Sequence, residues 1–165
     1  MNIHAKATGS TPTMSSAEWQ ARVDLAAVYR LVARHGWDDV IYNHCSMRVP
    51  GEDRKFLMKQ HELLWTEVTA SNLVKVDMDE DLDERAGVNR PGFTLHGGVL
   101  RGRPDVNCAV HVHTRIGMAI AGLKSGLRMI SPACCSWPWH GCSLQDLPLS
   151  GWPTTRDAGF ARYDD

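Results

Sequence analysis

The first regular pattern in the chain is an apolar stripe with helical spacing, which predicts an amphipathic helix over residues 16–35. Its apolar positions recur at i, i+3, i+4 and i+7: Leu25, Val28, Tyr29 and Val32. Ser15 and Glu18 have the spacing of a capping box, in which the serine hydroxyl accepts from the backbone N–H of Glu18. Gly36 can supply the left-handed residue that ends a helix.

A β-rich run over residues 38–49, a turn over residues 50–53 and an apolar run over residues 55–58 predict a β-hairpin. Side chains alternate along a strand, so His44, Ser46 and Arg48 should share one face. Three hydrogen-bonding side chains in a row could bind an anion such as a phosphate or carboxylate. The same row is also typical of a strand that faces solvent. The pattern by itself leaves both interpretations open.

The middle of the chain gives weaker signals. Residues 63–65 predict a short strand or turn, and Thr69 or Ser71 could cap a short helix that runs through Leu73 and Val74. Six acidic residues between positions 76 and 85 lack the spacing of a calcium loop, so we interpret them as a solvated face. Residues 91–103 predict a helix that Pro104 ends.

The segment from Asn107 to Thr114 is rich in β-formers and predicts a strand that presents two histidines. His111 and His113 are two residues apart, so both imidazoles should project from the same face. Same-face Cβ atoms at this spacing lie roughly 6 to 7 Å apart, close enough for both rings to converge on one cation. A His-x-His pair can equally be structural. Thr114 can cap a following helix that Gly122 ends, and residues 127–130 predict another strand.

Composition narrows the classes of function. The chain has 165 residues, enough for one domain, and 18 basic against 19 acidic residues give a net charge of −1. This balance argues against a nucleic-acid or anionic-membrane partner. No apolar run is long enough to span a bilayer, and the first residues lack the apolar core of a secretory signal. Five cysteines without a CxxC fit reduced thiols, so we expect a cytoplasmic protein.

The ends of the chain differ from its middle. Residues 1–14 have no apolar period and predict a flexible arm. Residues 133–165 hold three of the five cysteines and three of the six tryptophans, without helical or strand periodicity. We therefore expect a domain over residues 15–132, followed by an aberrant, poorly ordered tail such as a frame-shift would produce.

The chain resembles the class II aldolase/adducin N-terminal family in four successive segments: Trp37–Arg48, Thr69–Asp77, Gly92–His96 and Arg103–Thr114. The resemblance implies an α/β fold, a three-layer α/β/α sandwich with a mostly antiparallel central sheet, here C-terminally incomplete. It also implies a homo-oligomer with sites between subunits.

The resemblance further implies a divalent-metal site, with zinc the usual ion. His111 and His113 match two of the three metal-binding histidines, and the metal acts as a Lewis acid on the substrate carbonyl. His44 and Ser46 match the segment that surrounds the substrate phosphate or carboxylate, and Arg48 continues the same row. The implied function is that of a lyase or epimerase acting on a small hydroxy-carbonyl substrate of the sugar-phosphate kind.

Two departures leave alternatives open. The catalytic glutamate of family aldolases matches Gly92, so the catalytic residue here is unassigned. The third histidine of the family site would fall beyond Asp165. One alternative is therefore an adducin-like, non-catalytic module for oligomerisation or for actin and cytoskeletal partners. Another is an inactive, incomplete product with uncovered apolar faces.

Overall fold

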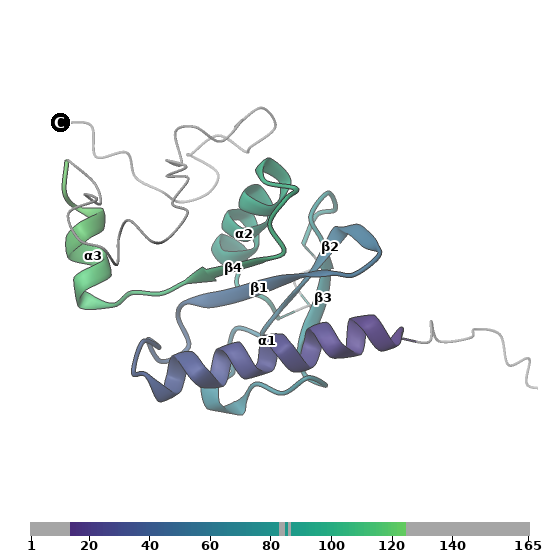
Figure 1. The fold of residues 1–165 in the computed structure, drawn as a ribbon, viewed down its shortest axis with the longest axis horizontal. Helices are drawn as coiled ribbons and strands as arrows, with labels where there is room; N and C mark the ends of the chain where they lie inside the picture. The colour runs from purple at the N-terminus through teal and green to yellow at the C-terminus, as the bar shows by residue number, and fades with distance from the viewer. Residues whose placement is uncertain (1–13, 83–84, 86, 125–165) are drawn as a thin grey trace, which may run out of the picture.

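The structure is a computed structural model that describes residues 14–82, 85 and 87–124 (Figure 1). The capped apolar stripe forms helix α1 (Ser16–Arg34), as predicted, and the Ser15 hydroxyl accepts from the Glu18 N–H at 3.0 Å. Leu25 and Tyr29 on this helix are fully buried. The local capping pattern and the apolar stripe thus agree, which is why this element could be predicted from sequence.

The sheet contains four described strands: β1 (His44–Val49), β2 (Glu52–Met58), β3 (Val74–Asp77) and β4 (Cys108–His111). Their order is β3-β2-β1-β4, and each neighbouring pair is antiparallel. β1 and β2 form the predicted hairpin. β1 also pairs with β4, in a register that places His44 opposite His111.

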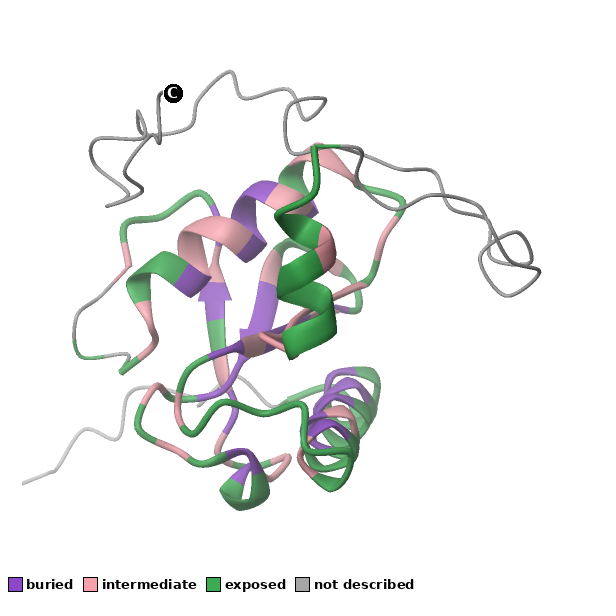
Figure 2. Ribbon diagram, turned by 90° about the vertical axis from the view of Figure 1, so that its left-hand side faces the viewer, coloured by how far each residue is buried: buried purple, intermediate pink, exposed green. Residues whose placement is uncertain are grey.

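Helices cover both faces of this sheet (Figures 1 and 2). Helix α1 packs on one face with the 3-10 helix η1 (Trp65–Glu67), over an apolar cluster that includes Tyr29, Cys45 and Trp65. Helix α2 (Arg90–Gly102) lies on the other face, over a cluster that includes Phe56 and Leu100. The three-layer α/β/α arrangement with an antiparallel sheet confirms the fold class expected from the sequence.

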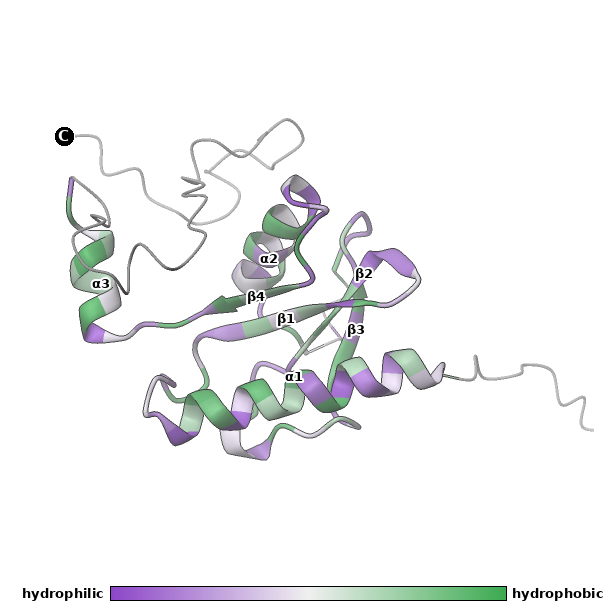
Figure 3. Ribbon diagram, in the orientation of Figure 1, coloured by the Kyte–Doolittle hydropathy of each residue, from purple (hydrophilic) through white to green (hydrophobic). Residues whose placement is uncertain are grey.

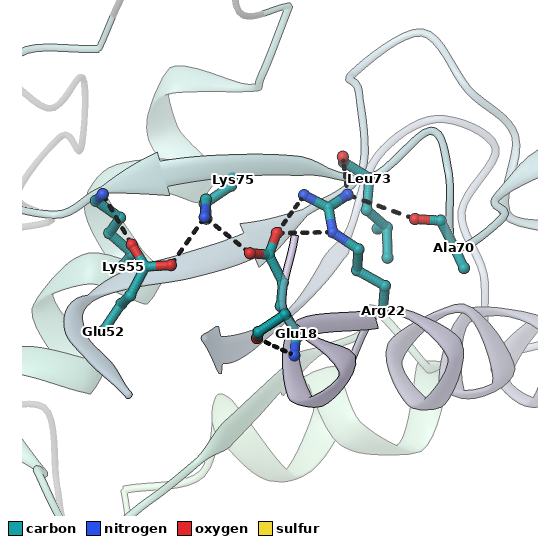
Figure 4. Close-up of polar contacts among 8 residues, drawn as sticks. Glu18, Arg22, Glu52, Lys55, Ala70, Leu73 and Lys75 are labelled. Atoms are coloured by element: carbon teal, nitrogen blue, oxygen red, sulfur yellow. Dashed lines mark hydrogen bonds and ion pairs between the residues drawn. The ribbon is translucent and has the colours of Figure 1, made fainter. Parts of the chain in front are cut away.

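A polar network fastens the start of α1 to the strands beneath it (Figure 4). Glu18 is buried and accepts from both Arg22 and Lys75, each at 2.8 Å. Lys75 on β3 also binds Glu52, at 2.8 Å. Burial raises the pKa of the Glu18 carboxyl, but its hydrogen bonds with Lys75 and Arg22 outweigh this and lower the pKa overall.

The predicted helix starting near Thr69 or Ser71 is wrong. Thr69 and Asn72 instead close a turn, in which the Thr69 N–H donates to Asn72 Oδ1 at 2.8 Å and the Asn72 N–H to Thr69 Oγ1 at 3.3 Å. The chain then continues into β3, which pairs with β2. Tertiary pairing with a distant strand overrides the local capping pattern.

The solvent-facing interpretation of the β1 row is also wrong. Ser46 has no exposed surface and His44 is half-buried, because helix α2 covers this face. The β-rich run contributes only its second half to the strand. Residues 38–43 form an irregular loop in which Val40 and Asn43 have φ values of 53° and 64°.

The last described element is helix α3 (Arg115–Ala121), which begins after Thr114 and ends at Gly122, as predicted. None of its residues is buried, and Ile116 is 76% exposed. Figure 3 shows apolar bands on this helix, which lies beyond the end of β4. No helix in the described part of the chain is long and apolar enough to cross a membrane.

Several predictions concern segments outside the described residues. They are the arm over residues 1–14, of which only Met14 is described, the strand over residues 127–130 and the tail over residues 133–165.

Candidate functional site

Four histidines meet where β1, β4 and α2 come together. His44 begins β1 and lies opposite His111, which ends β4. His113 follows two residues later, and His96 lies on the buried side of α2. The His44 ring stacks on the His111 ring, with centroids 5.1 Å apart. The antiparallel pairing of β1 with β4 therefore joins residues that are far apart in the sequence.

His111 and His113 converge as the strand alternation predicts, although the regular strand already ends at His111. Their Nε2 atoms are 2.9 Å apart, and their ring planes lie at 88° to each other. Burial, and then the neighbouring His113, lower the pKa of His111, so this imidazole stays neutral near pH 7. Neutral imidazole is the form that binds divalent metals.

Asp39 contacts the far side of this pair. Its Oδ2 lies 3.0 Å from Nδ1 of His113, although the two residues are 74 positions apart. The sequence patterns assign Asp39 no role. No local pattern could have identified it, because only the fold brings the 38–43 loop to the end of β4.

His44 and His96 form a second polar group with Ser46. His44 Nδ1 lies 2.7 Å from His96 Nε2, and His96 Nδ1 lies 2.5 Å from the Ser46 hydroxyl oxygen. Burial lowers the pKa of His96 to about 3, with further contributions from His44 and His111. Burial also lowers the pKa of His44 to about 4, followed by the effects of His111, Lys59 and His113. Both rings are therefore neutral, and each donates or accepts within the group.

Gly92 lies directly against the His44 ring. A Cβ atom at position 92 would be 2.5 Å from His44 Cδ2 and 2.6 Å from His44 Nε2. Real Cβ atoms do not come this close to ring atoms, so any larger residue here requires the imidazole to move. The His44 ring thus fills the space into which a side chain at position 92 would project.

Arg48, the third member of the predicted anion row, contacts backbone instead. Its guanidinium donates to the carbonyl oxygens of four residues: Asp53, Leu100, Val106 and Arg103. The bonds to Val106 and Asp53 measure 2.8 and 2.9 Å. Arg48 therefore joins the end of α2 to the hairpin, and its role in binding an anion stays a prediction.

The side chains that could bind a divalent metal here are of a suitable kind, but they are few. Two imidazoles converge at His111 and His113, and nitrogen ligands of this kind are typical of zinc sites. Within residues 14–82, 85 and 87–124 no group of three or more His, Cys, Asp or Glu side chains is arranged to hold a metal. In this part of the chain, the pair is the available protein contribution.

Comparison with known proteins places these features in a family. Residues 23–144 match the model of the class II aldolase and adducin N-terminal domain. An aldolase class 2 family protein of Caulobacter vibrioides is 46% identical over 129 residues, which are 73% of this chain and 50% of that protein. Mouse alpha-adducin is 48% identical over 119 residues, or 70% of this chain and 16% of the adducin. The chain thus spans about half the length of the bacterial relative.

Solved structures agree with this match. An aldolase II superfamily protein from Pseudomonas syringae has a TM-score of 0.66 at 46% identity, over 73% of this chain and 50% of its own. L-fuculose 1-phosphate aldolase from Glaciozyma antarctica shares the fold, with a TM-score of 0.67 at 24% identity over 78% of this chain and 54% of its own. The chain belongs to the class II aldolase and adducin N-terminal domain family.

Proposed function

We propose that this chain is the divalent-metal-binding part of a lyase or epimerase that acts on a small hydroxy-carbonyl substrate. The observation that carries the proposal is the convergence of His111 and His113, whose Nε2 atoms lie 2.9 Å apart. These two imidazoles would hold the metal, with zinc the first candidate. When bound, the metal would supply Lewis-acid polarisation of the substrate carbonyl.

The electrostatics of the pair support this assignment. Because burial lowers the pKa of His111, its ring nitrogen need not lose a proton before it binds a cation near pH 7. The neighbouring His44 is neutral for the same reason and adds no positive charge. A cation placed between His111 and His113 would therefore meet no positive charge on His111 or His44.

Ser46 and His96 would keep the His44 ring in place beside the metal. His96 is buried and lies within hydrogen-bond distance of both Ser46 and His44, so the ring has one well-defined position. From this position His44 would contact the anionic or hydroxyl part of a substrate. The half-buried imidazole thus presents a polar edge beside the His111 ring.

A second candidate is a non-catalytic module for oligomerisation or cytoskeletal partners, as in adducins. Gly92 favours it, because the position that matches the aldolase glutamate bears no side chain and the His44 ring occupies the adjoining space. The 48% identity to mouse alpha-adducin is also as high as that to the bacterial relative. Under this candidate, substitution of the paired histidines leaves partner binding and self-association unchanged.

Metal titration of the full chain tests the first candidate. Isothermal titration calorimetry with Zn²⁺ and Co²⁺ should give one site in the wild-type protein, and His111→Ala should abolish it. His35→Ala, at an exposed histidine after α1, is the matched control and should bind as the wild type does. Equal binding by the His111→Ala variant, or no binding by the wild type, would reject the metal site.

A further inference from the structure

We propose that Asp39 is a positioning residue, whose carboxylate fixes the tautomer and orientation of His113. Asp39 Oδ2 lies 3.0 Å from His113 Nδ1. A carboxylate only accepts hydrogen bonds, so this contact places a hydrogen on Nδ1 of His113, and in the tautomer that carries its single hydrogen there Nε2 keeps its lone pair. That lone pair is directed at His111, whose Nε2 lies 2.9 Å away. The inference rests on the proposed function, since this same Nε2 atom would bind the metal.

The loop that contains Asp39 includes two residues in an energetically unfavourable backbone conformation. Val40 is β-branched and has a φ of 53°, in the left-handed region that such residues rarely adopt. Asn43 has a φ of 64°, and its buried Oδ1 has no hydrogen-bond partner among the described residues. Strained residues of this kind persist only when the surrounding structure fixes them, and they gather at functional sites.

Four hydrogen bonds fix the loop in this conformation. The Tyr42 N–H donates to the Asp39 carbonyl at 2.8 Å, and the Trp65 indole donates to the Tyr42 carbonyl at 3.1 Å. Asn43 Nδ2 donates to the Trp37 carbonyl at 3.4 Å. Lys59 Nζ donates to the Ile41 carbonyl at 2.9 Å.

Lys59 shows how firmly the loop is held. Its side chain is buried, and its ammonium also donates to the carbonyls of three residues in the next loop: Gln60, His61 and Leu63. Burial lowers its pKa to about 8, so the ammonium remains charged at neutral pH. A buried cation thus ties the Asp39 loop to the neighbouring segment, which keeps the carboxylate at a fixed distance from His113.

Stability alone does not explain the contact between Asp39 and His113. Their side chains are 48% and 37% exposed, and polar pairs with this exposure add little to folding free energy. A carboxylate behind a metal-binding imidazole, however, changes metal affinity by about 10- to 100-fold. The strained loop is therefore better explained by orientation of His113 than by folding.

The test compares Asp39→Ala with Asp39→Asn and with Asp38→Ala, which removes an exposed acid from the same loop. Long-range ¹H–¹⁵N NMR spectra of the metal-free full chain should show His113 protonated at Nδ1 in the wild type. Asp39→Ala should lose this preference, whereas Asp39→Asn, which keeps an acceptor oxygen, and Asp38→Ala should retain it. Thermal midpoints of the variants should equal that of the wild type. A change in the His113 tautomer then reflects the orientation of this ring and not a loss of folding.

Zn²⁺ titration of the same variants provides the second measurement. Asp39→Ala should weaken binding by about 10- to 100-fold, and Asp38→Ala should not. An unchanged His113 tautomer in Asp39→Ala would overturn the positioning role, even if the wild type binds metal. Loss of the tautomer preference in a wild-type protein that binds no metal would support the positioning role and reject the proposed function.

Discussion

The two faces of strand β1 contain different kinds of residue. Cys45 and Val49 point to the α1 side and join its apolar cluster. Ser46 and His44 point to the α2 side and meet His96. Both faces are covered, but only one is apolar. Burying polar side chains costs free energy unless each finds a partner, so the side chains of β1 on the α2 side require hydrogen bonds, whereas those on the α1 side are apolar and require only close packing.

We therefore expect one face of β1 to contribute mainly to folding stability and the other mainly to the metal site. Substitutions on the α1 face should change folding stability but not metal affinity. The α2 face should tolerate substitution at moderate cost and change the properties of the site. Substitutions on the two faces, measured for both stability and metal binding, can confirm or reject this separation.

The largest loss of stability is expected for Leu25→Ala on helix α1. Leu25 is completely buried in the α1 cluster, so its truncation should cost about 2 to 5 kcal/mol in the free energy of unfolding. Urea denaturation measures this loss, and Zn²⁺ affinity of the folded fraction should be unchanged. A loss below about 1 kcal/mol would mean that this face is not the main core.

A smaller loss is expected for Tyr29→Phe, which removes one oxygen from the same face. The Tyr29 hydroxyl donates to the Cys45 carbonyl at 2.6 Å and accepts from the N–H groups of Cys45 and Lys59 at 2.9 and 3.3 Å. Without it these buried backbone groups lose a partner, at a cost of about 1 to 3 kcal/mol. Tyr42→Phe, at an exposed tyrosine, is the control and should match the wild type in urea denaturation.

The α2 face should make stability depend on pH. Burial lowers the pKa of His96 to about 3, whereas an unfolded histidine titrates near 6.5. Between these values the unfolded chain binds more protons, so stability is full above about pH 6.5 and falls as pH decreases toward 3, and His96 contributes at most about 1.4 kcal/mol per pH unit to this fall. Urea midpoints between pH 7 and 4.5 measure this slope, and His96→Gln should reduce it. An equal slope in the His96→Gln variant would mean that groups other than His96 cause the pH dependence.

The smallest effect is expected for Glu52→Gln, at the exposed end of the network in Figure 4. Its hydrogen bonds with Lys55 and then Lys75 lower the pKa of Glu52 to about 2, but the pair is open to solvent. Exposed ion pairs contribute at most about 1 kcal/mol, and salt screens them. Thermal melts with and without added salt should therefore hardly differ between this variant and the wild type.

The sequence predicted the elements whose causes are local. The capping box of α1 and the alternation that brings His111 and His113 together both act within a few residues, and both are present in the structure. The burial of Ser46 could not be predicted from β1, because helix α2 that covers it begins at Arg90. The contact of Asp39 with His113 depends on a loop with left-handed backbone at Val40, which nothing in the local sequence favours.

Metal binding at His111 and His113 is tested most directly by visible absorption of Co²⁺ with the double variant His111→Ala/His113→Ala, with the thermal midpoint measured on the same samples. Both rings are half-buried at the edge of the α2 face, so their removal should leave the fold intact. The cobalt spectrum should disappear in the double variant, while the thermal midpoint stays within a few degrees of the wild type. A cobalt spectrum that survives in the double variant would contradict the assignment of the metal to this pair.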